Sequence, residues 1–160
     1  MANIYQIGAG LVGRTMALDL SKDHTVFLAD NNLKLLESIK SEDPTIHIKK
    51  LDVKESNDLI KFIKNADVVL LAVPGFLGFD CLKKIIISKK NVVDISFSPE
   101  DSMQLDSLAK DNNVTAIIDA GVAPGIPNYI LGYHNRSMKI ESFEYFVGGL
   151  PKYPKEPFNY

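Results

Sequence analysis

The sequence predicts an α/β fold in which a doubly wound parallel sheet carries helices on both faces. Short apolar segments alternate with longer segments whose apolar residues recur at helical spacing, as expected when strands and helices follow one another. The first apolar segment, Ile4 to Ile7, runs directly into a complete G-x-G-x-x-G turn, Gly8 to Gly13. The alternation predicts right-handed crossovers and the strand order 3-2-1-4-5-6.

Length and composition are those of one ordinary domain. The chain has 160 residues, of which 46% are hydrophobic and 24% charged, with a formal net charge of -2. This balance offers no electrostatic case for binding nucleic acid or an anionic membrane. No apolar run reaches the roughly 20 residues of a membrane span, and the N-terminus lacks a signal-peptide pattern, so we expect a cytoplasmic protein.

The cysteine and the histidines of the sequence indicate neither a catalytic nucleophile nor a metal site. The single cysteine, Cys81, lies in an amphipathic stretch and is expected to be a small helix residue. The histidines, His24, His47 and His134, have no acidic or cysteine neighbours spaced as ligands, so we predict no metal site.

The glycine turn predicts a dinucleotide site. In such a unit Gly8 makes the tight turn, Gly10 lets the backbone approach a pyrophosphate, and Gly13 lets the next helix pack closely on the strand. The phosphates would lie on the N–H groups at the start of that helix, so the intervening Ala9 and the pair Leu11-Val12 are also candidate contacts. An ordinary turn after a buried strand is the alternative, and the neighbouring elements decide between the two.

The next two elements fit such a unit. Leu11 to Lys22 is predicted as the first crossover helix, and His24 to Ala29 as a parallel strand buried on both faces. Asp30 follows 22 positions after Gly8 (30 − 8 = 22), where a carboxylate can accept hydrogen bonds from the ribose hydroxyls.

Asp30 also bears on the choice of cofactor. Its charge would repel a 2′-phosphate, and the next residues, Asn31 and Asn32, offer no arginine to pair with one. We therefore expect NAD rather than NADP, with Asp30 and Asn31 beside the ribose. The alternative is that Asp30 or an adjacent asparagine only caps the following helix.

The alternation continues beyond this helix. Thr45 to Val53 is predicted as the third strand, Glu55 to Asn65 as a helix, and Val68 to Val73 as a central strand. Asp52 and Val53 end the third strand where dinucleotide-binding proteins place residues beside the adenine, although a polar residue leaving a strand is an equally good interpretation.

The central strand runs into Pro74-Gly75 at the point where the strand order reverses. There Ala72, Val73 and Pro74 would lay their backbone along the dinucleotide, whereas Pro-Gly is also a common turn that needs no ligand. Ser96 leaves a fifth strand, Val92 to Ile95, at the same edge and is a further candidate cofactor contact.

Two more predicted elements, a helix and a strand, complete the alternation. Ser98-Pro99-Glu100-Asp101 is typical of a helix start with Ser98 as the N-cap, and Val114 to Ile118 is the sixth strand. Together with the glycine turn, these elements are those of a Rossmann-type fold. Asp119 to Asn128 leaves the ligand-binding edge of the sheet, or is a structural turn into the helix Asn128 to Tyr133.

The C-terminal region predicts a change of domain. Glu141 to Val147 alternates in polarity and is expected to be a strand. We place the dinucleotide-binding domain at residues 1–136 and the beginning of a second, substrate and dimerisation domain at residues 137–160.

Four ordered motifs carry a family resemblance. Ala72 to Phe79, Val93 to Phe97, Asp119 to Gly125 and Val147 to Pro151 resemble the saccharopine dehydrogenase-like family. Within it the chain is most similar to the lysine 6-dehydrogenase branch, because Ala123 stands before the Pro-Gly where saccharopine reductases usually carry an acidic residue.

The resemblance implies an NAD-dependent enzyme that oxidatively deaminates the lysine 6-amino group to the semialdehyde. Asp119 is then the candidate catalytic residue, although capping a turn is an equally good role for it, and Gly149, Leu150 and Pro151 are candidate substrate contacts. Family members are longer, so the chain resembles the N-terminal part of a homodimeric enzyme and is expected to be inactive alone.

Other functions stay open at this point. Saccharopine dehydrogenase, saccharopine reductase and carboxypolyamine dehydrogenase are alternatives within the family. An NAD-sensing regulatory domain, as in potassium transport systems, shares the glycine turn and the acidic strand end but gives no reason for the motif Val147 to Pro151.

Overall fold

The computed structural model describes residues 1–148 and residue 153, and it divides the chain into two compact units, Met1–Gly121 and Val122–Tyr160. The first unit therefore ends 15 residues before the expected domain boundary at residue 136 (136 − 121 = 15). That boundary remains a prediction for the whole protein. Among the described residues, every helix is too short or too polar to cross a membrane.

The first unit is built on a six-stranded parallel sheet whose order is β3-β2-β1-β4-β5-β6, as the sequence predicts. The strands are β1 (Asn3–Ile7), β2 (Thr25–Asp30), β3 (His47–Lys50), β4 (Val68–Leu71), β5 (Val92–Asp94) and β6 (Ala116–Ile117). The strand order reverses between β1 and β4, which are direct neighbours. Ligands bind open parallel sheets at such a reversal.

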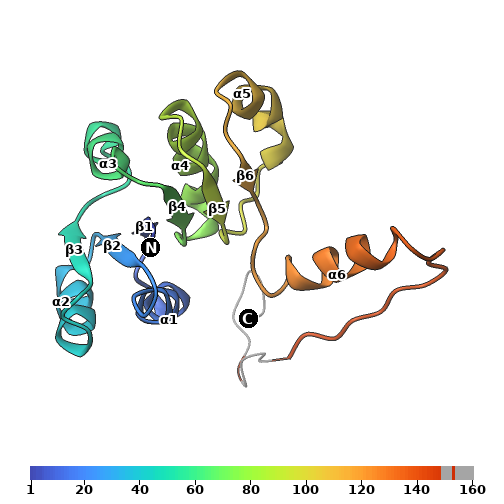
Figure 1. Ribbon diagram of the computed structural model, residues 1–160, viewed down its shortest axis with the longest axis horizontal. Helices are drawn as coiled ribbons and strands as arrows, with labels where there is room; N and C mark the ends of the chain where they lie inside the picture. Colours follow the sequence, from blue (N-terminus) through green and yellow to red (C-terminus); the bar gives the residue numbers. More distant parts are fainter. Residues whose placement is uncertain (149–152, 154–160) are drawn as a thin grey trace. The chain divides into compact units, whose positions relative to one another are not determined.

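Helices cover both faces of this sheet (Figure 1). One face carries α1 (Leu11–Leu20) and α2 (Leu33–Glu42). The opposite face carries α3 (Ser56–Ile63), α4 (Gly75–Ile87) and α5 (Asp106–Asp111), the last preceded by the short 3-10 helix η1 (Ser102–Leu105). The arrangement is the Rossmann-type fold expected from the alternation of apolar segments.

Each layer of helices has its own hydrophobic core. On the α1 and α2 side, Leu28 of β2 packs with Ala17, Leu36 and Ile39. On the other side, residues of β1, β4 and β5 pack against α3 and α4, and none of Leu59, Ile63 or Ile85 is exposed, all being at 0%. Adjacent residues of β2 therefore serve opposite layers, because Leu28 belongs to the first core while Phe27 packs against the second.

The helix start predicted at Ser98 is wrong. Asp101 caps η1 instead, because its Oδ1 accepts a hydrogen bond from Met103 N (2.9 Å). The Ser98 hydroxyl is engaged elsewhere and donates to the carbonyl oxygen of Gly75 (3.2 Å). A tertiary contact has thus taken the side chain that the local pattern assigned to the cap.

The second unit contains α6 (Ile126–His134), which begins two residues earlier than predicted. The strand predicted from 141 to 147 is not formed: these residues have no regular structure in the described chain, and all are exposed. Alternation alone does not make a strand, which also needs a neighbour to satisfy its backbone groups. Gly149, Leu150 and Pro151 lie outside the described residues.

Candidate cofactor-binding site

A cleft of about 710 Å³ lies in the first unit at the carboxyl ends of the strands. It is lined by the segments that follow β1, β2, β3, β4 and β5, so it spans the reversal of strand order. Its size is in the range of small-molecule and cofactor sites. Every candidate cofactor contact except Ala9 lines it: Gly8, Gly10, Leu11, Val12, Gly13, Asp30, Asn31, Asp52, Val53, Ala72, Val73, Pro74 and Ser96.

The glycines of the turn are constrained in different ways. Gly8 has a positive φ of 103°, and a Cβ added there would collide with the backbone oxygen of Ala72 in the neighbouring segment. A Cβ added at Gly13 would collide with the backbone oxygen of Gly8. Nothing lies within 4 Å of a Cβ added at Gly10. Gly8 and Gly13 are therefore required by the fold, whereas Gly10 borders open space on the cleft.

The start of α1 is suited to binding an anion. Gly10 is its N-cap, no described side chain caps the helix, and its first turn contains no acidic residue. The backbone N–H groups of the first turn have no intrahelical acceptor, and the helix dipole places positive charge there. Because Leu11, Val12 and Gly13 also line the cleft, a phosphate in it would meet these donors.

Asp30 connects the turn to the loop after β2. Its Oδ2 accepts a hydrogen bond from Ala9 N (2.8 Å), and its Oδ1 accepts one from Asn32 N (2.8 Å). Capping of α2 belongs to Asn32, whose Oδ1 accepts from Leu35 N (3.3 Å). Each carboxylate oxygen of Asp30 keeps a further lone pair. Asp30 can therefore hold the two loops and still accept a hydrogen bond from a ribose hydroxyl. Ala9 is completely buried, so its contribution to the site is the hydrogen bond that its N–H donates to Asp30.

The other wall of the cleft is formed by the start of α4 and the loop after β5. A Cβ added at Gly75 would collide with the backbone oxygen of Phe97. One added at Gly78 would collide with the hydroxyls of Ser96 and Ser98. The loop thus lies directly on the first turn of α4, in the space that the two missing side chains leave.

Two polar residues are buried beneath this wall. Asp94 is 2% exposed and Ser96 is 6% exposed, and Asp94 Oδ1 accepts a hydrogen bond from Ser96 N (2.7 Å). Burial raises the pKa of the Asp94 carboxyl, with a further contribution from the charge of Asp119, while the hydrogen bond from Ser96 opposes the shift. Ser96 Oγ has no hydrogen-bond partner among the described residues and belongs to the cleft lining. It offers a hydroxyl to a ligand.

Asp119 follows β6 with a positive φ of 50°. Aspartate tolerates this conformation better than most residues do. Asp119 is outside the set of described residues that line the cleft, and its catalytic role stays a prediction. Cys81 is buried in α4, where burial raises the pKa of its thiol to about 11. A thiol with such a pKa is a poor nucleophile.

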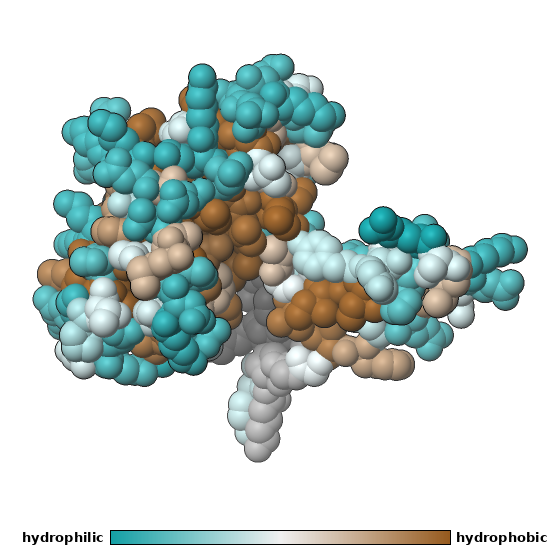
Figure 2. Space-filling view, viewed as in Figure 1, coloured by the Kyte–Doolittle hydropathy of each residue, from teal (hydrophilic) through white to brown (hydrophobic). Residues whose placement is uncertain are grey.

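Two aromatic residues line the cleft: Phe97, which the sequence places at the carboxyl end of the fifth strand, and Phe76, which was not predicted as a contact. Phe76 and Phe97 are 74% and 66% exposed, and together with Leu11 and Val12 they give the cleft exposed apolar side chains. Figure 2 shows hydrophobic surface between the largely hydrophilic helices of this unit. An aromatic residue in the first turn of the helix that follows β4 is the signal that could have found Phe76.

Comparison with known proteins identifies the family. Residues 4–117 match the family described as "Saccharopine dehydrogenase NADP binding domain". A saccharopine dehydrogenase (NADP(+), L-glutamate-forming) from Pyricularia oryzae is 28% identical over 160 residues, which cover 93% of this chain and 34% of that protein. An alpha-aminoadipic semialdehyde synthase from Arabidopsis thaliana is 32% identical over 107 residues, covering 64% of this chain and 10% of that protein.

Solved structures agree on the fold. Apo saccharopine dehydrogenase (L-Glu forming) from Saccharomyces cerevisiae superposes with a TM-score of 0.74 at 23% identity, covering 85% of this chain and 31% of that one. The chain thus spans about a third of the length of the saccharopine dehydrogenases it matches. With its glycine turn, strand order and matched residues in agreement, this chain belongs to the family of saccharopine dehydrogenase NADP-binding domains.

Proposed function

We propose that this chain forms the cofactor-binding part of an NAD-dependent oxidoreductase that acts on an amino acid, with oxidative deamination of the lysine 6-amino group as the specific reaction. The cofactor proposal is supported by one observation, which is that three features lie in the same cleft. They are the uncapped start of α1, the open space at Gly10 and the Asp30 carboxylate.

The residues of the cleft fit a dinucleotide. The first turn of α1 would hold the pyrophosphate on its N–H groups, and Asp30 would accept hydrogen bonds from the ribose. Ser96 Oγ, buried and without a partner among the described residues, supports a polar contact at the β5 side of the cleft. When bound, the nicotinamide supplies the acceptor for a hydride from the substrate carbon.

NAD is the proposed cofactor, although the relatives named above carry NADP in their descriptions. Two backbone N–H groups, from Ala9 and Asn32, hold the Asp30 carboxylate in place. A 2′-phosphate would add negative charge beside this fixed carboxylate, and Asn31 offers no positive charge to offset it.

The cofactor proposal is tested by titrating the chain with NADH and with NADPH and following ligand fluorescence. We expect tighter binding of NADH. Asp30→Asn keeps one acceptor oxygen and removes the charge, so it should narrow the difference between the two cofactors. Equal affinities in the unmodified chain would overturn the choice of NAD, and absence of binding to both would overturn the cofactor site.

The lysine proposal rests on the sequence resemblance and on Ala123 before Pro124-Gly125. In the longer protein that the relatives suggest, L-lysine should support NAD reduction, while this chain alone should bind NADH without turnover. Activity only with saccharopine or with a carboxypolyamine would assign the protein to those branches. Binding without any such activity would favour an NAD-sensing domain. From the resemblance we also propose a homodimer for the longer protein, and from the sequence pattern a cytoplasmic location.

A further inference from the structure

Gln6 is a polar side chain at the centre of the sheet. It belongs to β1, where its register partners are Leu28 of β2 and Leu70 of β4, and it is 0% exposed. A buried amide is unfavourable unless hydrogen bonds replace those it made with water. The bonds of Gln6 therefore indicate why an amide stands there.

Both donors of this amide are directed at the glycine turn. Gln6 Nε2 donates to the carbonyl oxygen of Gly8 (2.9 Å) and to that of Gly13 (2.6 Å). Two carbonyl acceptors fix the orientation of the amide, because a rotated amide would place Oε1 against both of them. Oε1 itself has no hydrogen-bond partner among the described residues. Among the described residues, this side chain thus bonds only to the first and third glycines of the turn.

The turn is closely packed at the same place. A Cβ added at Gly13 would lie 3.0 Å from Gln6 Nε2, in addition to its collision with the oxygen of Gly8. Gly8 and Gly13 bracket the residues whose N–H groups begin α1, and both line the cleft. The position of these N–H groups relative to β1 therefore depends on the Gln6 amide, which bonds to the carbonyl oxygens of both Gly8 and Gly13.

We propose that Gln6 is a positioning residue for the cofactor: its amide holds the glycine turn in the shape in which the first turn of α1 receives the pyrophosphate. This inference rests on the proposed dinucleotide binding. Gln6 touches no ligand in this arrangement, because it acts through Gly8 and Gly13. A role in fold stability alone is the competing interpretation, and the two differ in what they expect for the affinity of folded variants.

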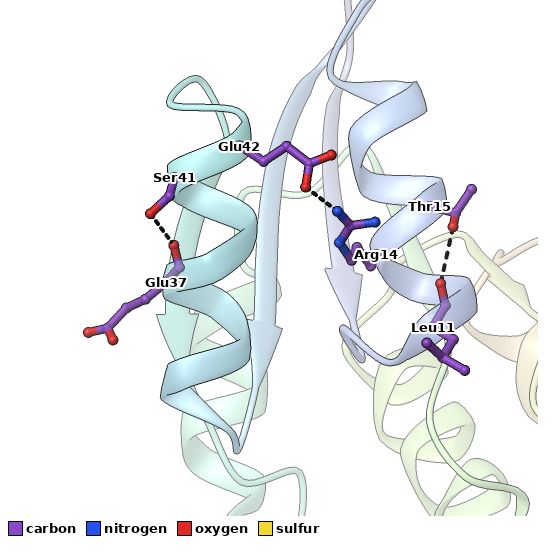
Figure 3. A network of polar contacts seen from close by, with 6 residues as sticks. All are labelled: Leu11, Arg14, Thr15, Glu37, Ser41 and Glu42. Atoms are coloured by element: carbon purple, nitrogen blue, oxygen red, sulfur yellow. Dashed lines mark hydrogen bonds and ion pairs between the residues drawn. The ribbon is translucent and has the colours of Figure 1, made fainter.

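The test measures binding of ADP-ribose, which contains the pyrophosphate, by calorimetry on the 160-residue chain. Gln6→Met keeps the length of the side chain but cannot donate, so we expect at least tenfold weaker binding. The matched control is Thr15→Val, which removes a hydrogen bond from Thr15 Oγ1 to the oxygen of Leu11 (3.1 Å) on the exposed side of α1 (Figure 3). The control should bind within twofold of the unmodified chain.

Gln6→Glu supplies a readout that a structural role would not move. A protonated carboxyl can donate one hydrogen bond to the turn, whereas a carboxylate only accepts and would face two carbonyl oxygens. Binding by Gln6→Glu should therefore strengthen at least tenfold as the pH falls from 8 to 5, while Gln6→Met shows no such gain. Circular dichroism selects the conditions in which each variant is folded, and if Gln6→Met does not fold, the Gln6→Glu comparison decides.

The outcomes separate the two proposals. If the unmodified chain does not bind ADP-ribose or NADH, the proposed cofactor function is overturned. If it binds and the folded Gln6 variants bind within twofold of it at every pH, the positioning role is overturned while the cofactor site stands. Weaker binding by the folded variants, recovered by Gln6→Glu when its carboxyl is protonated at low pH, supports the positioning role.

Discussion

The two walls of the cleft use glycine in the same way but draw on different partners. At the start of α1, a Cβ added at Gly13 would collide with the backbone oxygen of Gly8 in the same turn and lie 3.0 Å from Gln6 Nε2. One added at Gly8 would collide with the backbone oxygen of Ala72, which follows the neighbouring strand β4. At the start of α4, Gly75 and Gly78 are matched instead to the loop after β5, twenty residues further along the chain. The first wall is built mainly within the glycine turn itself, apart from the contact of Gly8 with Ala72, and we call it the local wall. The second is built wholly by contact with a loop outside its own strand and helix, and we call it the tertiary wall.

This difference explains why the glycines of the α1 wall can be recognised from the sequence, whereas those of the α4 wall cannot. A turn that must bend, admit a phosphate and pack on its own strand needs glycine at fixed intervals, whatever the rest of the protein does. A helix that packs against a distant loop needs small residues one turn apart, but the loop can be of many kinds. The spacing of Gly75 and Gly78 therefore carries meaning only when the partner is known.

Gly8→Ala tests the point at which the local wall touches another strand end, at Ala72, and should have the largest effect. A side chain at φ 103° is strained by about 1 kcal/mol, and collision with a backbone oxygen adds about 3 kcal/mol, so we expect a loss of about 4 kcal/mol in the free energy of unfolding. Urea denaturation measures it.

The control in the same turn is Gly10→Ala, which has open space around its Cβ. Its unfolding free energy should change by less than about 1 kcal/mol, while NADH binding weakens at least tenfold because the methyl group would occupy the path of the pyrophosphate. A stable Gly8→Ala protein, or a Gly10→Ala protein that binds normally, would contradict the division of roles within the turn.

Gly78→Ala tests the tertiary wall. Its Cβ would meet two serine hydroxyls, which can move more readily than backbone, so we expect a loss of about 2 kcal/mol. Adding Ser96→Ala and Ser98→Ala removes both hydroxyls but keeps the Cβ at position 96, which lies 2.9 Å from the added carbon, so about half of the loss should be recovered. The control is Gly132→Ala in α6, where nothing lies within 4 Å and a gain of up to about 1 kcal/mol is expected from helix propensity. An equal loss in both variants would show that the loop does not constrain Gly78.

Much of the fold and part of the site could be predicted because both follow from local rules. The strand order and the glycine turn come from periodicity and spacing, and the segments that end β1 to β5 were expected at one edge. Gln6 was missed because one polar residue among Ile4, Tyr5 and Ile7 does not disturb an apolar strand pattern. Ser98 was assigned to a cap because its hydrogen bond to Gly75, which replaces that role, joins segments 23 residues apart.

Asp94→Asn tests the buried polar layer under the tertiary wall. Because burial raises the pKa of Asp94 in the folded protein, ionisation weakens folding: the penalty is absent below the unfolded pKa and fully present above the folded one. Asn keeps the oxygen that accepts from Ser96 N. The variant should therefore melt at a higher temperature than the unmodified chain at pH 7, and this difference should vanish as the pH falls below the ordinary range of aspartate. A variant that is less stable at pH 7 would show that the Asp94 charge stabilises the wall.

The smallest effect is expected for the ion pair that lies beside the local wall. Arg14, directly after the turn in α1, pairs with Glu42 at the end of α2 (Figure 3). The side chains are 40% and 47% exposed, so water and salt screen the pair, and it should contribute about 0.5 kcal/mol or less. A double-mutant cycle with Arg14→Ala and Glu42→Ala, measured by urea denaturation at low and high salt, gives this coupling directly. A coupling above about 1 kcal/mol that persists in high salt would mean that α2 helps to hold the turn. The local wall would then depend on a second tertiary contact besides that of Gly8 with Ala72. The contrast with the α4 wall would narrow to the chemistry of these contacts, which is charge at Arg14 and close packing at Gly75 and Gly78.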